Sequence, residues 1–153
     1  MIFKLNRFFL LGVSLLVFSG AALAGDDNDN TCGILSVLIV NTTKDTCKLI
    51  DQRLNHGYVI GNTHIPVYIP PNSSAPALEL IQSRMWGPEI ILTYRCGEGR
   101  LISLNTRQNF CLLSAGRITG QVTDRRGMTA DYTAKEGSYF WNQHGTISWA
   151  LQG

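Results

Sequence analysis

The sequence lacks the short motifs by which common hydrolases are recognised. It contains no Gly-x-Ser-x-Gly nucleophile turn and no His-Glu-x-x-His zinc motif. Its histidines are scattered among loop-like segments, where an imidazole is usually solvated or caps a turn. Its carboxylates stand in turns or at strand ends, and no two of them can be assigned to opposite sides of a cleft. The residues considered are His56, His64 and His144, and Glu89, Glu98, Asp124, Asp131 and Glu136. The sequence therefore does not predict an enzyme.

The sequence also has little net charge once its N-terminus is set aside. The whole chain has 13 Lys and Arg against 11 Asp and Glu. Lys4 and Arg7 belong to the N-terminal segment described next, which leaves 11 basic residues against 11 acidic ones. A chain without a summed positive field does not attract nucleic acid, so we expect no nucleic-acid partner.

Only the N-terminus contains a long apolar run. Lys4 and Arg7 precede the apolar segment Phe8 to Phe18, and Ala22-Leu23-Ala24 supplies the small residues of a cleavage site. This pattern predicts that residues 1–24 are a signal peptide, because the run is shorter than the ~20 residues of a membrane span. The signal predicts a secreted or periplasmic protein and does not distinguish between these two locations.

Cleavage after Ala24 leaves 129 residues, enough for one domain. We expect residues 25–33 to form a flexible polar N-terminus and residues 34–153 to form the folded domain.

Four cysteines, Cys32, Cys47, Cys96 and Cys111, follow the predicted signal. An even number of cysteines in an oxidising compartment predicts two disulfides. Three pairings are possible, and the equal local spacings favour Cys32 with Cys47 and Cys96 with Cys111. No pair has the short spacing of a structural zinc site, and we expect neither a metal nor a cofactor.

The folded region is predicted to be all-β, because short apolar or alternating segments are separated by turn residues every eight to twelve positions. Ile34 to Val40 is apolar on both faces, as in a central strand, and is followed by a polar turn at residues 41–45. Pro66 and Pro70 place the alternating segment 65–69 at a sheet edge, since proline cannot donate a ladder hydrogen bond. We expect a single-domain antiparallel β-sandwich or small barrel.

The later strands are predicted from the same alternation. Residues 90–96 and 101–104 form the clearest hairpin, and the final strand, 146–151, is regular enough to pair inside a sheet. Residues 78–81 are either a strand or a helical turn. Further strands are expected at 110–113, 118–122 and 128–133.

Aromatic residues in the second half supply the candidate binding residues. Tyr94 and Trp149 lie in alternating strands and are predicted to be buried. In contrast, Arg84 and Trp86 form one cluster beside turn residues, and Tyr139, Phe140 and Trp141 form a second. Exposed aromatics near arginine are typical anchors for a protein partner or a membrane interface. The alternative is that these aromatics belong to the core, as most tryptophans do in a small β-domain.

Residues 37–96 resemble the aegerolysin-type secreted β-sandwich proteins. The resemblance lies in Val40-Asn41-Thr42, His56-Gly57, Ile65-Pro66 with Ile69-Pro70-Pro71, and Gly87-Pro88-Glu89 leading to Leu92-Thr93-Tyr94. It implies a compact two-sheet sandwich that binds membrane lipids and in some cases assists a pore-forming partner.

The second half resembles the bacterial inhibitors of C-type lysozyme. The resemblance lies in Tyr94-Arg95-Cys96, in Ala130-Asp131-Tyr132-Thr133, and in the segment from Tyr139-Phe140-Trp141 to Gly145. It implies a small periplasmic or lipid-anchored barrel that binds lysozyme.

Together these features predict an exported, non-enzymatic binding protein that recognises a membrane surface or a secreted or host protein. A lysozyme-type inhibitor and a small secreted hydrolase with an unrecognised site are the alternatives. Lipid binding predicts a contiguous exposed patch of Trp, Tyr and Phe. Inhibition predicts a protruding loop around residues 124–131, and hydrolysis predicts a pocket with convergent ionisable groups.

Overall fold

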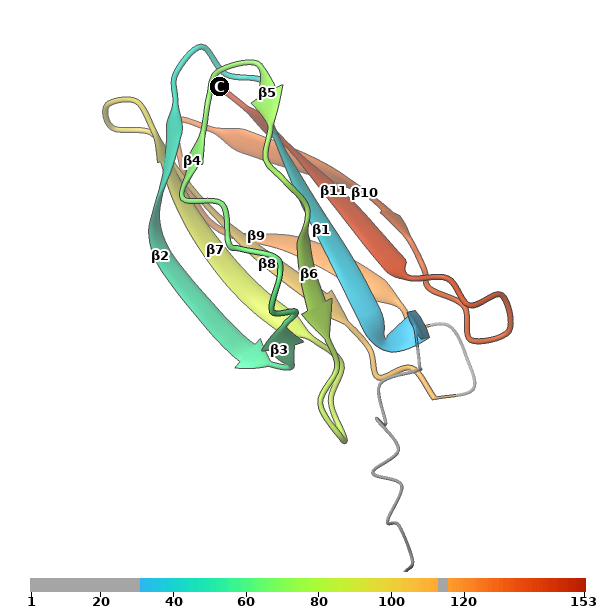
Figure 1. Cartoon of the computed structure of the whole chain (residues 1–153). Helices are drawn as coiled ribbons and strands as arrows, with labels where there is room; N and C mark the ends of the chain where they lie inside the picture. The colour runs from blue at the N-terminus through green and yellow to red at the C-terminus, as the bar shows by residue number, and fades with distance from the viewer. Residues whose placement is uncertain (1–30, 113–115) are drawn as a thin grey trace, which may run out of the picture.

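The computed structural model describes residues 31–112 and 116–153, which form two β-sheets packed face to face (Figure 1). The predicted signal peptide and residues 25–30 lie outside the described residues. The sheets contain β1 (Ile34–Asn41), β2 (Cys47–His56), β3 (Tyr58–Val59), β4 (Tyr68–Ile69), β5 (Ser73–Ser74), β6 (Leu78–Ile81), β7 (Glu89–Cys96), β8 (Leu101–Gln108), β9 (Ile118–Arg126), β10 (Thr129–Lys135) and β11 (Gly145–Gln152). The predicted all-β sandwich is confirmed.

The first sheet has the strand order β10-β11-β1-β6-β3, with β5 also paired to β1. Strands β1 and β11 are parallel neighbours, from the pair of Leu35 with Gly145 to the pair of Asn41 with Leu151. The blue and red ribbons of these two strands run side by side in Figure 1. The predicted central position of residues 34–40 and the internal pairing of the last strand are both confirmed.

The second sheet has the order β4-β2-β7-β8-β9, and all its pairings are antiparallel. The predicted hairpin is β7–β8, and the short strand β4, next to Pro66 and Pro70, lies at the sheet edge as expected. Residues 78–81, which the sequence left undecided, form strand β6.

The core lies between the sheets. Alternate residues of β1, Leu35, Val37 and Ile39, point inward and are almost completely buried, and Tyr94 and Trp149 are buried among them. Trp149 donates a hydrogen bond from its indole nitrogen to Thr106 Oγ1 at 2.8 Å, so its one polar atom is satisfied. The prediction that these two aromatics belong to the core is confirmed.

The disulfide pairing favoured by the sequence is wrong. The bonds join Cys32 to Cys111 and Cys47 to Cys96, across 79 and 49 residues respectively. The eight residues of β1 separate Cys32 from Cys47, and at ~3.3 Å per residue they place the two cysteines at opposite ends of the sandwich. Strand β8 separates Cys96 from Cys111 in the same way. Cys47 and Cys96 are instead register partners on β2 and β7, with Cα atoms 4.0 Å apart.

The N-terminal boundary and one predicted strand also differ from expectation. Residues 31–33, expected to belong to the flexible N-terminus, form a short 3-10 helix in which Cys32 is buried. A strand was expected at residues 110–113, but the described part of this segment, residues 110–112, does not form one. Their apolar character has another cause, because Cys111 is buried in its disulfide and Phe110 and Leu112 line a groove.

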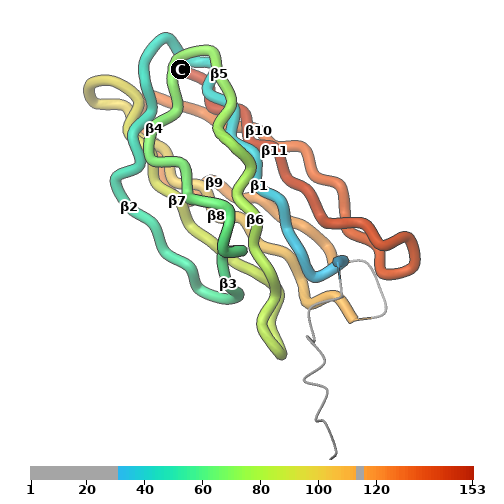
Figure 2. The backbone as a smooth tube through the Cα atoms, viewed as in Figure 1, coloured from blue at the N-terminus to red at the C-terminus, as the bar shows by residue number. Residues whose placement is uncertain are grey.

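The two ends of the sandwich differ in their connections. The smooth trace in Figure 2 shows the C-terminus, β5 and the β7–β8 turn at one end, with the β6–β7 and β10–β11 loops at the other. Register agrees with this view, because Ile34 at the start of β1 pairs with Ile81 at the end of β6, and Leu35 pairs with Gly145 at the start of β11. Both loops therefore lie at the same end of the first sheet.

Candidate functional site

Three connections at one end of the sandwich together form a surface that we call the aromatic end. They are the β6–β7 loop (residues 82–88), the β10–β11 loop (residues 136–144) and residues 109–112 after β8. Six large apolar side chains on these connections are about half exposed or more. They are Met85 (77 %), Trp86 (55 %), Leu112 (61 %), Tyr139 (48 %), Phe140 (79 %) and Trp141 (78 %).

The structure thus brings both predicted aromatic clusters to the same end of the molecule. Arg84 and Trp86 are exposed in the β6–β7 loop, and Tyr139, Phe140 and Trp141 are exposed in the β10–β11 loop. The alternative that these aromatics are core residues therefore does not describe the structure. Met85 and Leu112 extend the exposed apolar surface, although neither was a candidate binding residue from the sequence.

An open groove of about 870 Å³ adjoins the β6–β7 loop. Ile34 and Ile81 are register partners on β1 and β6, and Tyr58 pairs with Ile81 from β3. Most other groove residues come from the adjoining loops, and Arg84 is the one Lys, Arg, Asp or Glu among the described lining residues. The lining consists of Ile34, Tyr58, Val59, Ile60, Gly61, Ile81, Gln82, Ser83, Arg84, Phe110 and Leu112.

The wall formed by residues 109–112 is fixed to its surroundings. The Gln82 side chain donates from Nε2 to the Cys111 carbonyl oxygen at 3.0 Å, and its Oε1 accepts from the Cys111 backbone nitrogen at 2.9 Å. The Cys32–Cys111 disulfide ties the same segment to the start of the described chain. Phe110 and Leu112 are therefore held beside the groove by a covalent bond and by two hydrogen bonds.

The β10–β11 loop has its own internal structure. Ser138 and Gln143 form an isolated β-bridge, and the backbone nitrogen of Trp141 donates to Ser138 Oγ at 3.3 Å. Tyr139 and Phe140 contact each other edge to face, with ring centroids 5.8 Å apart. The loop is also joined to the start of the described chain, since Thr31 Oγ1 donates to Asn142 Oδ1. This tight reversal directs Phe140 and Trp141 into solvent.

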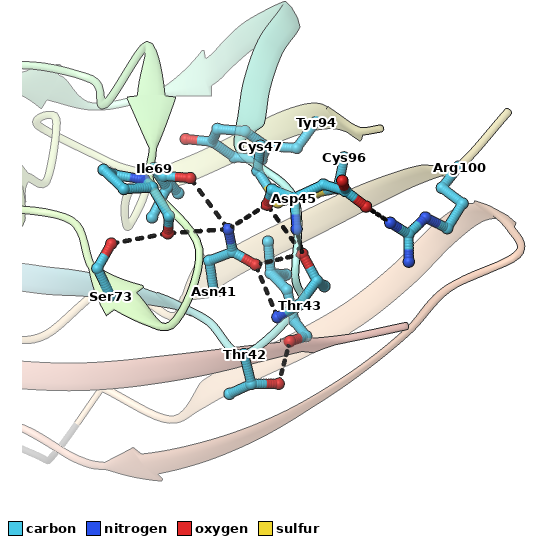
Figure 3. Close-up of a disulfide and its surroundings, with 12 residues drawn as sticks. Asn41, Thr42, Thr43, Asp45, Cys47, Ile69, Ser73, Tyr94, Cys96 and Arg100 are labelled. Carbon is cyan, nitrogen blue, oxygen red and sulfur yellow. Dashed lines mark hydrogen bonds and ion pairs between the residues drawn. A yellow bond between two sulfur atoms is a disulfide. The ribbon is translucent and has the colours of Figure 1, made fainter. Parts of the chain in front are cut away.

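The polar cluster at the opposite end is structural (Figure 3). Asn41 Nδ2 donates to the carbonyl oxygens of Asp45, Ile69 and Pro70 at 2.8–3.0 Å, and its Oδ1 accepts from Thr43. Arg100 forms an ion pair with Asp45 nearby. These bonds join the β1–β2 turn to β4, and the polar groups of Asn41 find their partners within the protein.

Two further properties bear on the type of site. The described residues contain no group of three or more His, Cys, Asp or Glu side chains placed to hold a metal ion. Within residues 31–112 and 116–153 no helix has the length and hydropathy needed to cross a bilayer.

Comparison with known proteins identifies a shared fold. No family model and no curated protein matches the sequence. The crystal structure of the lipid binding protein Nakanori has a TM-score of 0.62 at 8 % identity, with 78 % of this chain and 71 % of that chain covered. IP-1A from Alcaligenes faecalis has a TM-score of 0.56 at 12 % identity (80 % and 92 % covered). The RahU protein, in complex with a TRIS molecule, has a TM-score of 0.58 at 9 % identity (80 % and 96 % covered).

At such low identity the likeness shows the fold alone, a small β-sandwich. It confirms neither the aegerolysin nor the lysozyme-inhibitor resemblance. The two disulfides are typical of proteins that fold in an oxidising compartment.

Proposed function

We propose that this protein is an exported, non-enzymatic binding protein that attaches to membrane lipid surfaces through its aromatic end. The observation that carries the proposal is the gathering of Met85, Trp86, Leu112, Phe140 and Trp141, all more than half exposed, on three loops at one end of a rigid sandwich. An exposed apolar surface of this kind marks a site of interaction.

The composition of the aromatic end favours a lipid surface. Tryptophan and tyrosine are enriched where a protein meets the boundary between lipid headgroups and acyl chains, because their rings are apolar and their N–H or O–H groups stay hydrated. Phe140 and Trp141 project furthest into solvent by exposure, at 79 % and 78 %. Burying each such side chain contributes about 2 kcal/mol, so a few of them suffice for reversible attachment.

The groove supports binding over catalysis. Among the described residues that line it, Arg84 is the one Lys, Arg, Asp or Glu, and none is a histidine or a carboxylate that could act as a general base. A largely apolar groove beside exposed aromatics suits an acyl chain or another apolar part of a lipid.

The fold likeness to Nakanori, described as a lipid binding protein, supports the same proposal. In contrast, no feature of the described residues favours lysozyme inhibition. Residues 124–131, where a protruding loop was expected, belong to the ends of β9 and β10 and to the short Gly127–Met128 turn between them. Export by a signal peptide that is cleaved after Ala24 is part of the proposal, and the two disulfides support it.

The proposal predicts that the oxidised protein, residues 25–153, sediments with vesicles of phosphatidylcholine, alone or mixed with an anionic lipid or a sterol. The double substitution Phe140→Ser with Trp141→Ser should reduce the bound fraction at least tenfold, because two fully projecting apolar anchors are lost. Tyr68→Ser is the matched control, since Tyr68 is 59 % exposed but lies on β4, away from the aromatic end. Absence of sedimentation with every vesicle, or an equal loss in the Tyr68 variant, would contradict the proposal.

A further inference from the structure

A second polar cluster, different from the one around Asn41, lies on the outer face of the second sheet, next to the aromatic end. Its centre is Glu89, the first residue of β7, whose Oε1 accepts hydrogen bonds from Asn55 Nδ2 at 3.1 Å and from Asn105 Nδ2 at 3.3 Å. The three side chains come from adjacent strands, β2, β7 and β8. They are only partly buried, so the cluster is open to solvent on one side.

The cluster retains hydrogen-bonding groups that the fold does not use. Asn105 Oδ1 is shielded from solvent and has no partner among the described residues, although buried polar atoms are almost always paired. Arg107 is the register partner of Glu89 and is exposed, yet the ion pairs of the described residues do not include one between them. If the cluster had a purely structural role, we would expect an ion pair between Glu89 and Arg107 and a hydrogen bond to Asn105 Oδ1.

A flat aromatic surface stands beside the cluster. His56 is the register partner of Glu89 on the other side, and the Trp86 indole stacks on the His56 ring with centroids 5.2 Å apart and an interplanar angle of 16°. Trp86 is 55 % exposed, so much of the indole remains accessible. The stacking holds the indole above the same sheet face that carries Glu89 and Asn55.

We propose that this surface, formed by Trp86, Asn55, Glu89, Asn105 and Arg107, binds one pyranose ring of a glycan. A sugar ring has an apolar C–H face that packs on an indole and a rim of hydroxyls that both donate and accept hydrogen bonds. The carboxylate of Glu89 is an acceptor for those hydroxyls and the guanidinium of Arg107 is a donor, while Asn105 holds the Glu89 carboxylate in position through its hydrogen bond. Glu89 at the centre disfavours an anionic ligand, so the proposed unit is a neutral sugar.

The proposal is independent of membrane attachment, although Trp86 belongs to both surfaces. It is therefore tested without lipid, by saturation-transfer NMR and calorimetry with the methyl glycosides of glucose, galactose, mannose, N-acetylglucosamine and N-acetylgalactosamine, and by a printed array of neutral oligosaccharides. At least one of these probes should bind. Asn105→Ala and Trp86→Ala should each weaken its binding about tenfold or more, since Trp86→Ala removes the stacking surface and Asn105→Ala removes the hydrogen bond that positions the Glu89 carboxylate.

Arg95→Ala is the matched control for Arg107→Ala, because both arginines are exposed and lie on the second sheet but Arg95 is at the far end of β7. Only Arg107→Ala should weaken sugar binding. Phe140→Ser with Trp141→Ser should leave sugar binding unchanged while it abolishes vesicle binding, which keeps the two proposals separable. Vesicles with and without a neutral glycolipid then distinguish a lipid-borne sugar from a free glycan. The proposal is overturned if no probe binds the wild-type protein, or if Asn105→Ala and Trp86→Ala bind as tightly as the wild type.

Discussion

The carboxamide of Asn41 connects segments that lie far apart in the sequence. It is completely buried and bonds to Asp45, Ile69 and Pro70 as well as to Thr43. Asn41→Ala removes these bonds and leaves carbonyl oxygens without donors. We expect the free energy of unfolding to fall by about 3 kcal/mol, as measured by urea titration. Asn62→Ala, at an exposed loop residue, should change it by less than about 0.5 kcal/mol.

Tyr94 illustrates how burial links one side chain to pH. Its hydroxyl donates to the Pro66 carbonyl oxygen at 2.9 Å, and burial raises the pKa of the Tyr94 phenol above its usual value. The neutral phenol is therefore favoured by the folded state, and the stability linked to it is complete below about pH 10 and decreases as the pH rises above that value.

We accordingly expect the ultraviolet titration of the protein to contain a late step, in which Tyr94 ionises only as the protein unfolds. Tyr94→Phe should remove this delayed step and, by leaving the Pro66 carbonyl unpaired, lower stability by about 1–2 kcal/mol at neutral pH. Ionisation of Tyr94 while the wild type is still folded would contradict this role for burial.

Whether a side chain is buried could be predicted from the sequence where its neighbours show a clear alternation of apolar and polar residues. Tyr94 and Trp149 alternate with polar residues and were expected in the core, where the structure places them. For Trp86 and Phe140, which stand beside turn residues, the sequence left exposure and a place in the core as alternatives, and both side chains are exposed. Phe110 and Leu112 were misassigned to a strand because an apolar run does not reveal whether it packs in a sheet or lines a groove. Tyr58 carried no local signal at all.

At the scale of strands, those with one clear apolar face were predictable and β2 was not. Most residues of β2 are exposed and polar, because only the short strand β4 covers its outer edge. Its alternation is therefore weak, and the sequence did not predict a strand over residues 47–56. The disulfides were mispaired for a related reason, since the register that makes Cys47 and Cys96 neighbours is a long-range property of the sheet.

The two disulfides should have similar effects on stability and different effects on binding. In the chain-entropy treatment, closing loops of 79 and 49 residues stabilises the fold by about 4.5 and 4 kcal/mol respectively. The Cys32–Cys111 bond also holds the groove wall, whereas Cys47–Cys96 lies at the opposite end. Replacing Cys32 and Cys111 by alanine should therefore weaken vesicle sedimentation several-fold, while alanines at Cys47 and Cys96 should not.

This comparison is made at a temperature where both variants remain folded by circular dichroism. Equal vesicle binding by the two double variants would show that the groove wall does not contribute to attachment. Peptide mapping of the oxidised wild-type protein should recover the Cys32–Cys111 and Cys47–Cys96 peptides.

At the scale of the whole molecule, the sandwich has two chemically different ends. The end that carries Asn41 and the Arg100–Asp45 ion pair has its polar groups satisfied internally. The aromatic end exposes apolar side chains around an open groove, and the polar cluster at Glu89 lies beside it on the second sheet. The proposed attachment through the aromatic end therefore predicts a defined orientation, with the long axis of the sandwich pointing away from the membrane.

Quenching of tryptophan fluorescence by vesicles with brominated acyl chains tests this orientation most directly. The protein has three tryptophans, of which Trp86 and Trp141 lie at the aromatic end and Trp149 is 1 % exposed in the core. Membrane attachment through the aromatic end predicts that the wild-type emission falls on binding. The variant Trp86→Phe with Trp141→Phe, which keeps apolar anchors and leaves only Trp149, should still sediment with the vesicles but show little quenching. Equal quenching of the two proteins, or sedimentation of the wild type without quenching, would contradict attachment through the aromatic end.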